Sequence, residues 1–266
     1  MRTGKVYFTS DAHLGSAYHV DPKAVERRLV RWLESIRPLA SAVYFLGDMF
    51  DYWFEYRNVV PRGFTRFLGT LSLMSDEGIE IHFFTGNHDV WFADYIATEV
   101  GATVHHRTEV VDILGKRFRL AHGDEECSTQ SRSEWAIYHI FRSRLCRALY
   151  ASVHPRWTVG LAMAWSLYSR KQGMKAQTIG TIPHAYANDY FDLEREPLIR
   201  VAKELATTQP DIDYFLFGHR HLMVDMALRG DKRVMILGDW LQYNSFAVWD
   251  GSVLYLDQFE PDNEEA

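Results

Sequence analysis

The sequence has few cysteines and no long apolar run. Only Cys127 and Cys146 occur among its 266 residues, so we expect neither a disulfide framework nor a metal site built from thiolates. The most apolar stretch, 157–168, is about twelve residues long, whereas a helix that crosses a bilayer needs roughly 20. These two absences argue against a disulfide-stapled secreted domain and against a membrane-spanning protein.

The sequence also lacks a leader pattern and an excess of positive charge. Residues 1–5 run directly into a strand-like segment, which leaves no room for a signal peptide, and we expect a cytoplasmic protein. The formal net charge of −6 does not favour a nucleic acid as partner. Hydrophobic residues make up 47% of the chain, enough for a sizeable core in one large domain or two small ones.

The sequence does contain five short polar clusters, each directly after an apolar, strand-like run. The clusters are Asp11-Ala12-His13, Gly47-Asp48, Gly86-Asn87-His88-Asp89, His122-Gly123-Asp124 and Gly218-His219-Arg220-His221. A single Asp-x-His is more often turn chemistry than a metal site, but five such clusters in this order indicate a site. The carboxyl ends of strands in a layered α/β domain converge on one edge, so the clusters are expected to meet there.

Seven residues of these clusters are candidate metal ligands. They are Asp11, His13, Asp48, Asn87, His122, His219 and His221. Carboxylate, amide oxygen and imidazole suit manganese, iron or zinc, whereas calcium would require a shell made almost wholly of oxygen. Two divalent ions about 3.5–4 Å apart can share a carboxylate, polarise a phosphoryl group and lower the pKa of a water. The set therefore predicts hydrolysis of a phosphate ester or anhydride, with Asp48 as the bridging carboxylate.

The ordered motifs resemble those of the calcineurin-like metallophosphoesterase superfamily. Within it the chain is most similar to the UDP-2,3-diacylglucosamine pyrophosphatases of lipid A synthesis. The supporting segments are Ser10–Gly15, Gly47–Trp53, His122–Asp124 and Gly238–Trp240. The resemblance implies an α/β layered fold, with two β-sheets sandwiched by helices, and hydrolysis of the substrate to UMP and 2,3-diacylglucosamine 1-phosphate. A general phosphoesterase for a small phosphomonoester, phosphodiester or nucleotide diphosphate is the alternative, because all branches share the ligand motifs.

The resemblance also assigns roles to residues. It implies one metal held by Asp11, His13, Asp48 and His221, and a second held by Asp48, Asn87, His122 and His219, with manganese as the expected metal. Pyrophosphatases of this branch carry Arg after the motif Asn, whereas this chain has His88. A His there can donate a proton to a leaving oxygen or contact a phosphate, which makes His88 the catalytic candidate and keeps the alternative open. We expect Asp51, Asp89 and Asp124 to orient ligands or loops.

Between the fourth and fifth clusters lies a basic and aromatic stretch that we expect to form a helical cap insertion. From 127 to 175 there are eight Arg or Lys residues and a single acidic one, so the rest of the chain is strongly acidic. The predicted domains are a core of 1–126 and 191–259, a cap of 127–190 and an acidic tail of 260–266. A subdomain that packs on its own core and a surface that touches a membrane both remain open.

The cap favours a nucleotide-linked lipid as substrate, with peripheral contact to a membrane surface and no nucleic acid partner. The expected apolar wall comprises Trp135, Phe141, Leu145, Leu149, Trp157, Met163 and Trp165. The expected substrate-binding basic residues are Arg170, Lys171 and Lys175. A nuclease would need a basic track outside the cap, and a non-enzymatic scaffold would not need the intact ligand set. The oligomeric state is not indicated by the sequence.

Overall fold

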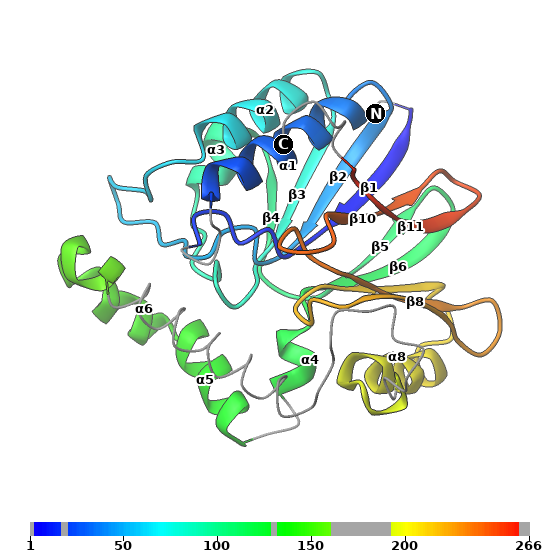
Figure 1. Cartoon of the computed structure of the whole chain (residues 1–266). Helices are drawn as coiled ribbons and strands as arrows, with labels where there is room; N and C mark the ends of the chain where they lie inside the picture. Colours follow the sequence, from blue (N-terminus) through cyan, green and yellow to red (C-terminus); the bar gives the residue numbers. More distant parts are fainter. Residues whose placement is uncertain (1–2, 17–20, 129–131, 161–192, 261–266) are drawn as a thin grey trace.

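Two β-sheets pack face to face, and helices cover both outer faces (Figure 1). This computed structural model describes residues 3–16, 21–128, 132–160 and 193–260. The predicted fold class, a layered α/β architecture with two sheets between helices, is confirmed. Among the described residues, no helix is both long and apolar enough to cross a bilayer.

The first sheet has the strand order β11-β10-β1-β2-β3-β4. Its strands are β1 (Lys5–Thr9), β2 (Ala40–Leu46), β3 (Glu80–Phe84), β4 (Thr103–His105), β10 (Ser245–Trp249) and β11 (Leu254–Gln258). Strands β1 to β4 run parallel, whereas β10 is antiparallel to both β1 and β11. The carboxyl ends of β1, β2 and β3 therefore lie at the same edge.

The second sheet has the order β5-β6-β7-β9-β8. Its strands are β5 (Glu109–Ile113), β6 (Lys116–Ala121), β7 (Tyr214–Phe217), β8 (Met223–Ala227) and β9 (Arg233–Leu237). The central strands β6, β7 and β9 are parallel, and the outer strands β5 and β8 pair with them antiparallel. Strands β8 and β9 form one hairpin, and β10 and β11 form another.

The helices are α1 (Pro22–Ile36), α2 (Thr65–Asp76), α3 (Tyr95–Val100), α4 (Asp124–Ser128), α5 (Arg132–Arg142), α6 (Arg144–Ala151) and α8 (Pro197–Thr208), with a 3-10 turn at Leu193–Arg195. Helix α1 begins at Pro22 because the Asp21 side chain accepts a hydrogen bond from the Lys23 N–H and Pro22 suits the first turn. In Figure 1, α1, α2 and α3 cover the first sheet and α8 covers the second, while α5 and α6 lie away from both.

Apolar side chains fill three layers. Successive residues of a strand point to opposite faces, so Phe45 packs under the helices of the first sheet while Leu46 packs between the sheets. A third layer joins the second sheet to α8 through Leu198 and Phe215. Both faces of the central strands are buried, which explains why the sequence shows continuous apolar runs there instead of alternation. The predicted cap is helical in α5 and α6, but 161–192 lie outside the described residues, so the domain division stays a prediction.

Candidate metal centre

All seven candidate ligands follow parallel strands whose carboxyl ends lie at one edge of the fold. The first sheet supplies Asp11, His13, Asp48 and Asn87, and the second supplies His122, His219 and His221. The side chains meet where the two sheets face each other. The sequence therefore predicted correctly that these distant clusters converge.

The first group of ligand atoms centres on Asp11. Its Oδ1 lies 3.7 Å from His13 Nε2 and 3.6 Å from His221 Nε2. The rings of His13 and His221 stack with their centroids 5.1 Å apart. Asp11 is fully buried, and its Oδ1 accepts no hydrogen bond from any residue that the structure describes. A buried carboxylate oxygen that faces two imidazole nitrogens without a donor suits a cation.

The second group centres on Asn87. Its Oδ1 lies 3.2 Å from His122 Nε2 and 3.0 Å from His219 Nδ1. Asp48 Oδ2 lies 3.4 Å from His122 Nε2 and 3.8 Å from His13 Nε2, so this carboxylate stands between the two groups. A carboxylate in that position has the geometry needed to bridge two ions.

Partners outside the cluster fix the orientation of the imidazoles. His122 Nδ1 donates to the Leu46 carbonyl at 2.8 Å, and His221 Nδ1 donates to Asp239 Oδ2 at 3.0 Å. Both rings therefore direct Nε2 with its lone pair toward the carboxylates. The sequence analysis gave Asp239 no such role. Its signal was the Gly-Asp pair directly after β9, the same pattern that marks Gly47-Asp48.

Asp89 organises the loop that follows β2. Its carboxylate accepts hydrogen bonds from the N–H groups of Gly86 at 2.8 Å, Asp48 at 3.2 Å and Met49 at 2.9 Å. Burial, together with the charge of Asp48, raises the pKa of Asp89 to about 7. The position of Asp89 agrees with the expectation that it orients a ligand loop.

The backbone at the site is unusual, because five candidate ligands have positive φ. The values are 54° for Asp11, 43° for His13, 52° for Asp48, 67° for His219 and 50° for His221. Non-glycine residues rarely adopt this left-handed conformation, and such strain concentrates at functional sites.

Two glycines allow the carboxylates to approach the backbone closely. A Cβ on Gly86 would lie 2.1 Å from Asp48 Oδ1, and a Cβ on Gly218 would lie 2.6 Å from Asp11 Oδ2. Neither distance is compatible with a side chain, so both positions require glycine. The glycines beside the ligands therefore serve the geometry of the site.

Electrostatics at the site favour ionised carboxylates. Burial opposes ionisation of Asp11, but the adjacent imidazoles of His221 and His13 lower its pKa to about 2. Burial likewise opposes ionisation of Asp48, but the neighbouring His122 holds its pKa well below the usual range. Burial together with the charge of His122 lowers the pKa of His219 to about 4. The buried site thus concentrates negative charge that positive charge must balance.

His88 lies beside the cluster with its ring partly exposed. Its Nδ1 lies 3.0 Å from the Asp51 carbonyl and donates to it, and this hydrogen bond orients the ring. The ring meets His13 edge-on, with centroids 4.8 Å apart. Asp51 Oδ1 also lies 3.5 Å from His13 Nδ1. Asp51 therefore holds both rings in the way expected of an orienting residue.

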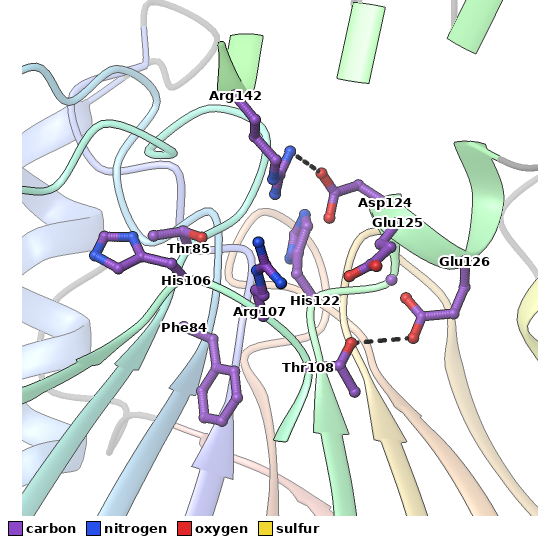
Figure 2. A pocket seen from close by; sticks show the side chains of 11 residues that line it. Phe84, Thr85, His106, Arg107, Thr108, His122, Asp124, Glu125, Glu126 and Arg142 are labelled. Carbon is purple, nitrogen blue, oxygen red and sulfur yellow. Dashed lines mark hydrogen bonds and ion pairs between the residues drawn. The ribbon is translucent and has the colours of Figure 1, made fainter. Parts of the chain in front are cut away.

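A small polar pocket adjoins His122 (Figure 2). In it Arg142, from α5, reaches Asp124 with an Nη1–Oδ2 distance of 2.9 Å. The lining residues are Phe84, Thr85, His106, Arg107, Thr108, His122, Gly123, Asp124, Glu125, Glu126 and Arg142. The sequence analysis did not find Arg142, because nothing in its local pattern indicates which loop it contacts. The predicted substrate contacts Arg170, Lys171 and Lys175, with Met163 and Trp165, lie outside the described residues.

Comparison with known proteins agrees with this geometry. The calcineurin-like phosphoesterase family profile matches residues 4–223. The chain belongs to this family. The UDP-2,3-diacylglucosamine hydrolase of Porphyromonas gingivalis is 64% identical over 96% of this chain and 98% of its own length. The Escherichia coli K12 protein of the same name is 26% identical over 88% of this chain and 90% of its own length.

Among solved structures, the phosphoesterase Yfce of Escherichia coli is 15% identical and covers 96% of this chain and 92% of its own, with a TM-score of 0.41. Family membership and the clustered Asp and His side chains make the chain a hydrolase that binds divalent metal ions. The predicted superfamily is confirmed.

Proposed function

We propose that this protein hydrolyses the diphosphate bond of UDP-2,3-diacylglucosamine, yielding UMP and 2,3-diacylglucosamine 1-phosphate for lipid A biosynthesis. The observation that carries the proposal is the 64% identity, over nearly the whole chain, with a hydrolase named for that substrate. The metal cluster supports the same reaction class. The alternative is a general phosphoesterase, and His88 beside the cluster is the feature that favours it.

We propose two divalent ions at the cluster, with manganese as the working metal. One is held by Asp11, His13, Asp48 and His221, and the other by Asp48, Asn87, His122 and His219. The oxygen and nitrogen donors suit manganese, and the buried Asp11 Oδ1 without a donor is placed to ligate a cation. When bound, the two ions supply an activated water and stabilise charge on the phosphoryl oxygens.

The protein's own residues then orient the reaction. Asp48 fixes the spacing between the two ligand groups because it lies between His13 and His122. The Asp51 carbonyl holds the His88 ring, so that its Nε2 can give a proton to the leaving phosphate oxygen or donate a hydrogen bond to it. This proton or hydrogen bond offsets the negative charge that develops on the leaving phosphate oxygen as its bond to phosphorus breaks.

The cap supports a lipid-linked substrate. Leu145 and Leu149 on α6 are 68% and 62% exposed, and Trp157 is 67% exposed, beside the basic Arg144 and Arg147. Exposed apolar side chains beside basic ones suit acyl chains or the surface of an anionic membrane. We propose peripheral membrane contact there, on the cytoplasmic side of the inner membrane, and phosphate contacts from Arg170, Lys171 and Lys175.

The test compares kcat/KM for the diacyl nucleotide, for analogues with shorter acyl chains and for UDP-N-acetylglucosamine. Each buried CH₂ is worth roughly 0.8 kcal/mol, so shortening both chains by several carbons should weaken binding severely. Near-equal kcat/KM values for the lipid-linked and the lipid-free nucleotide would overturn the lipid proposal and favour the general phosphoesterase.

A further inference from the structure

The last turn of α5 contacts two loops that carry candidate ligands. The Phe141 carbonyl accepts a hydrogen bond from Trp91 Nε1 at 2.6 Å, and Arg142 Nη1 lies 2.9 Å from Asp124 Oδ2. Trp91 belongs to the loop after β3, which also carries His88. Asp124 is the first residue of α4, directly after the His122-Gly123 segment that follows β6. Because β3 and β6 are in different sheets, two consecutive residues of α5 join the ligand loops of both sheets.

Helix α6 adds a contact with the third ligand loop. The hydroxyl groups of Tyr150 and Tyr52 lie 3.1 Å apart, and the Tyr150 ring lies 4.7 Å from that of Phe54 and 4.8 Å from that of Trp91. Tyr52 and Phe54 follow Asp48 in the loop after β2. The helical arm α5–α6 therefore touches the loops after β2 and β3 and the start of α4 with polar and aromatic groups.

Arg142 is the residue of the α5–α6 arm that forms an ion pair with Asp124. Its side chain is 19% exposed and that of Asp124 is 10% exposed, and the guanidinium carbon lies 4.0 Å from the centroid of the Tyr138 ring. Removing one partner of a largely buried ion pair leaves the other charge without compensation. Arg200 on α8 is exposed, lies outside the α5–α6 arm and offers a control.

We propose that Arg142 is a positioning residue. Through Asp124, and together with Trp91, it fixes the position of the α5–α6 arm relative to the metal centre. This inference rests on the proposed function only for the identity of the substrate that the arm helps to place. Turnover of a substrate that contacts the arm depends on the position of the arm. Turnover of a small phosphodiester that contacts only the metal centre does not.

The test compares Arg142→Met with Arg200→Met, each as the metal-loaded full chain. Amide hydrogen exchange should rise within 132–142 and within 122–128 for Arg142→Met alone. For the lipid-linked nucleotide, kcat/KM should fall by about 10–100-fold in that variant, the scale expected for a misplacement of about 1 Å. Hydrolysis of bis(4-nitrophenyl) phosphate and the metal content should stay near the wild-type values.

Milder variants keep the test informative if Arg142→Met folds poorly. Arg142→Lys retains the charge but loses the planar guanidinium, and should show a smaller change in the same direction. Trp91→Phe retains the ring contacts and removes the donor to Phe141. Both test variants should raise exchange in α5.

Unchanged exchange in Arg142→Met, or an equal loss of both activities together with metal, would overturn the inference. If the wild-type protein cleaves the small diester but not the lipid-linked nucleotide, the proposed function fails. In that case, raised exchange across both segments in Arg142→Met still supports the coupling between the arm and the ligand loop.

Discussion

Asp48 is the residue on which both ligand groups depend, since it lies between His13 and His122. We expect Asp48→Ala to lose bound metal and to abolish turnover. The fold should be affected much less, because the substitution removes a buried charge without creating a large cavity. Elemental analysis and circular dichroism would measure the two effects, with the exposed Asp76→Ala as control. Full metal occupancy in Asp48→Ala would contradict the bridging role.

His88 carries the second prediction at this scale. His88→Ala should lower kcat by roughly 10²–10⁴-fold while metal remains bound, the usual range for a positioned acid or base. The exposed His139→Ala on α5 is the control, and it should retain wild-type turnover. If His88→Ala turns over at the wild-type rate, the role of His88 is to pack against His13 and not to act on substrate.

At the scale of elements, helix α2 contains a glycine without a structural reason. A Cβ on Gly69 would meet nothing within 4 Å, whereas a Cβ on Gly86 would strike Asp48. Gly69→Ala should raise the free energy of unfolding by about 0.5–1 kcal/mol, because alanine is the better helix former. Gly86→Ala should instead lose metal. Urea titrations of both variants would check the contrast, and destabilisation by Gly69→Ala would contradict it.

Strands β3 and β4 are joined by a histidine pair that makes stability depend on pH. His82 Nδ1 lies 3.1 Å from His105 Nε2, and burial, with the charge of His82, lowers the pKa of His105 to about 4. In the unfolded chain His105 has a pKa of about 6.5. Between about pH 4 and pH 6.5 the unfolded chain therefore binds a proton at His105 that the folded protein does not bind. Stability should therefore be level above about pH 6.5 and fall as the pH drops toward 4. Urea midpoints for the wild type and His105→Gln should diverge over that range and agree at pH 8.

The strands that lead into the ligand clusters were predicted because their faces are mostly buried, which gives uninterrupted apolar runs. Strand β4 was not predicted because Thr103–His105 is three residues long and only partly buried. Strand β5 was missed because Glu109–Ile113 forms the edge of its sheet with most side chains outside the core, and its sequence shows neither a long apolar run nor strict alternation. Helix α8 was also missed, although it covers a whole face of the second sheet.

The site follows a similar rule. The candidate ligands were predictable because each stands in a short motif at the end of a strand. Asp239 and Arg142 were not, because their roles depend on which loops the folded chain brings beside them. A sequence motif predicts the local backbone geometry around its own residues. A contact with a residue from another helix or strand can be identified only when the tertiary structure is known.

For the whole molecule, metal should contribute to stability. The site gathers buried carboxylates whose charges a divalent ion balances, and a ligand that binds only the folded state stabilises it in proportion to the logarithm of its concentration. Chelation should lower the thermal midpoint, and added Mn²⁺ should restore it. Differential scanning fluorimetry would show this for the wild type, and Asp48→Ala should show no difference between the two conditions. An equal response in both proteins would place the stabilising ion elsewhere.

Within the residues that the structure describes, no strand of one sheet pairs with a strand of the other, and neither sheet carries the whole ligand set. A chain that has formed one sheet during refolding thus possesses only half of a binding site. Tight uptake of metal must wait until the sheets have docked, because a preformed site rarely exists in an incompletely folded chain. The time at which a refolding sample binds a divalent metal ion would therefore report when its two sheets dock.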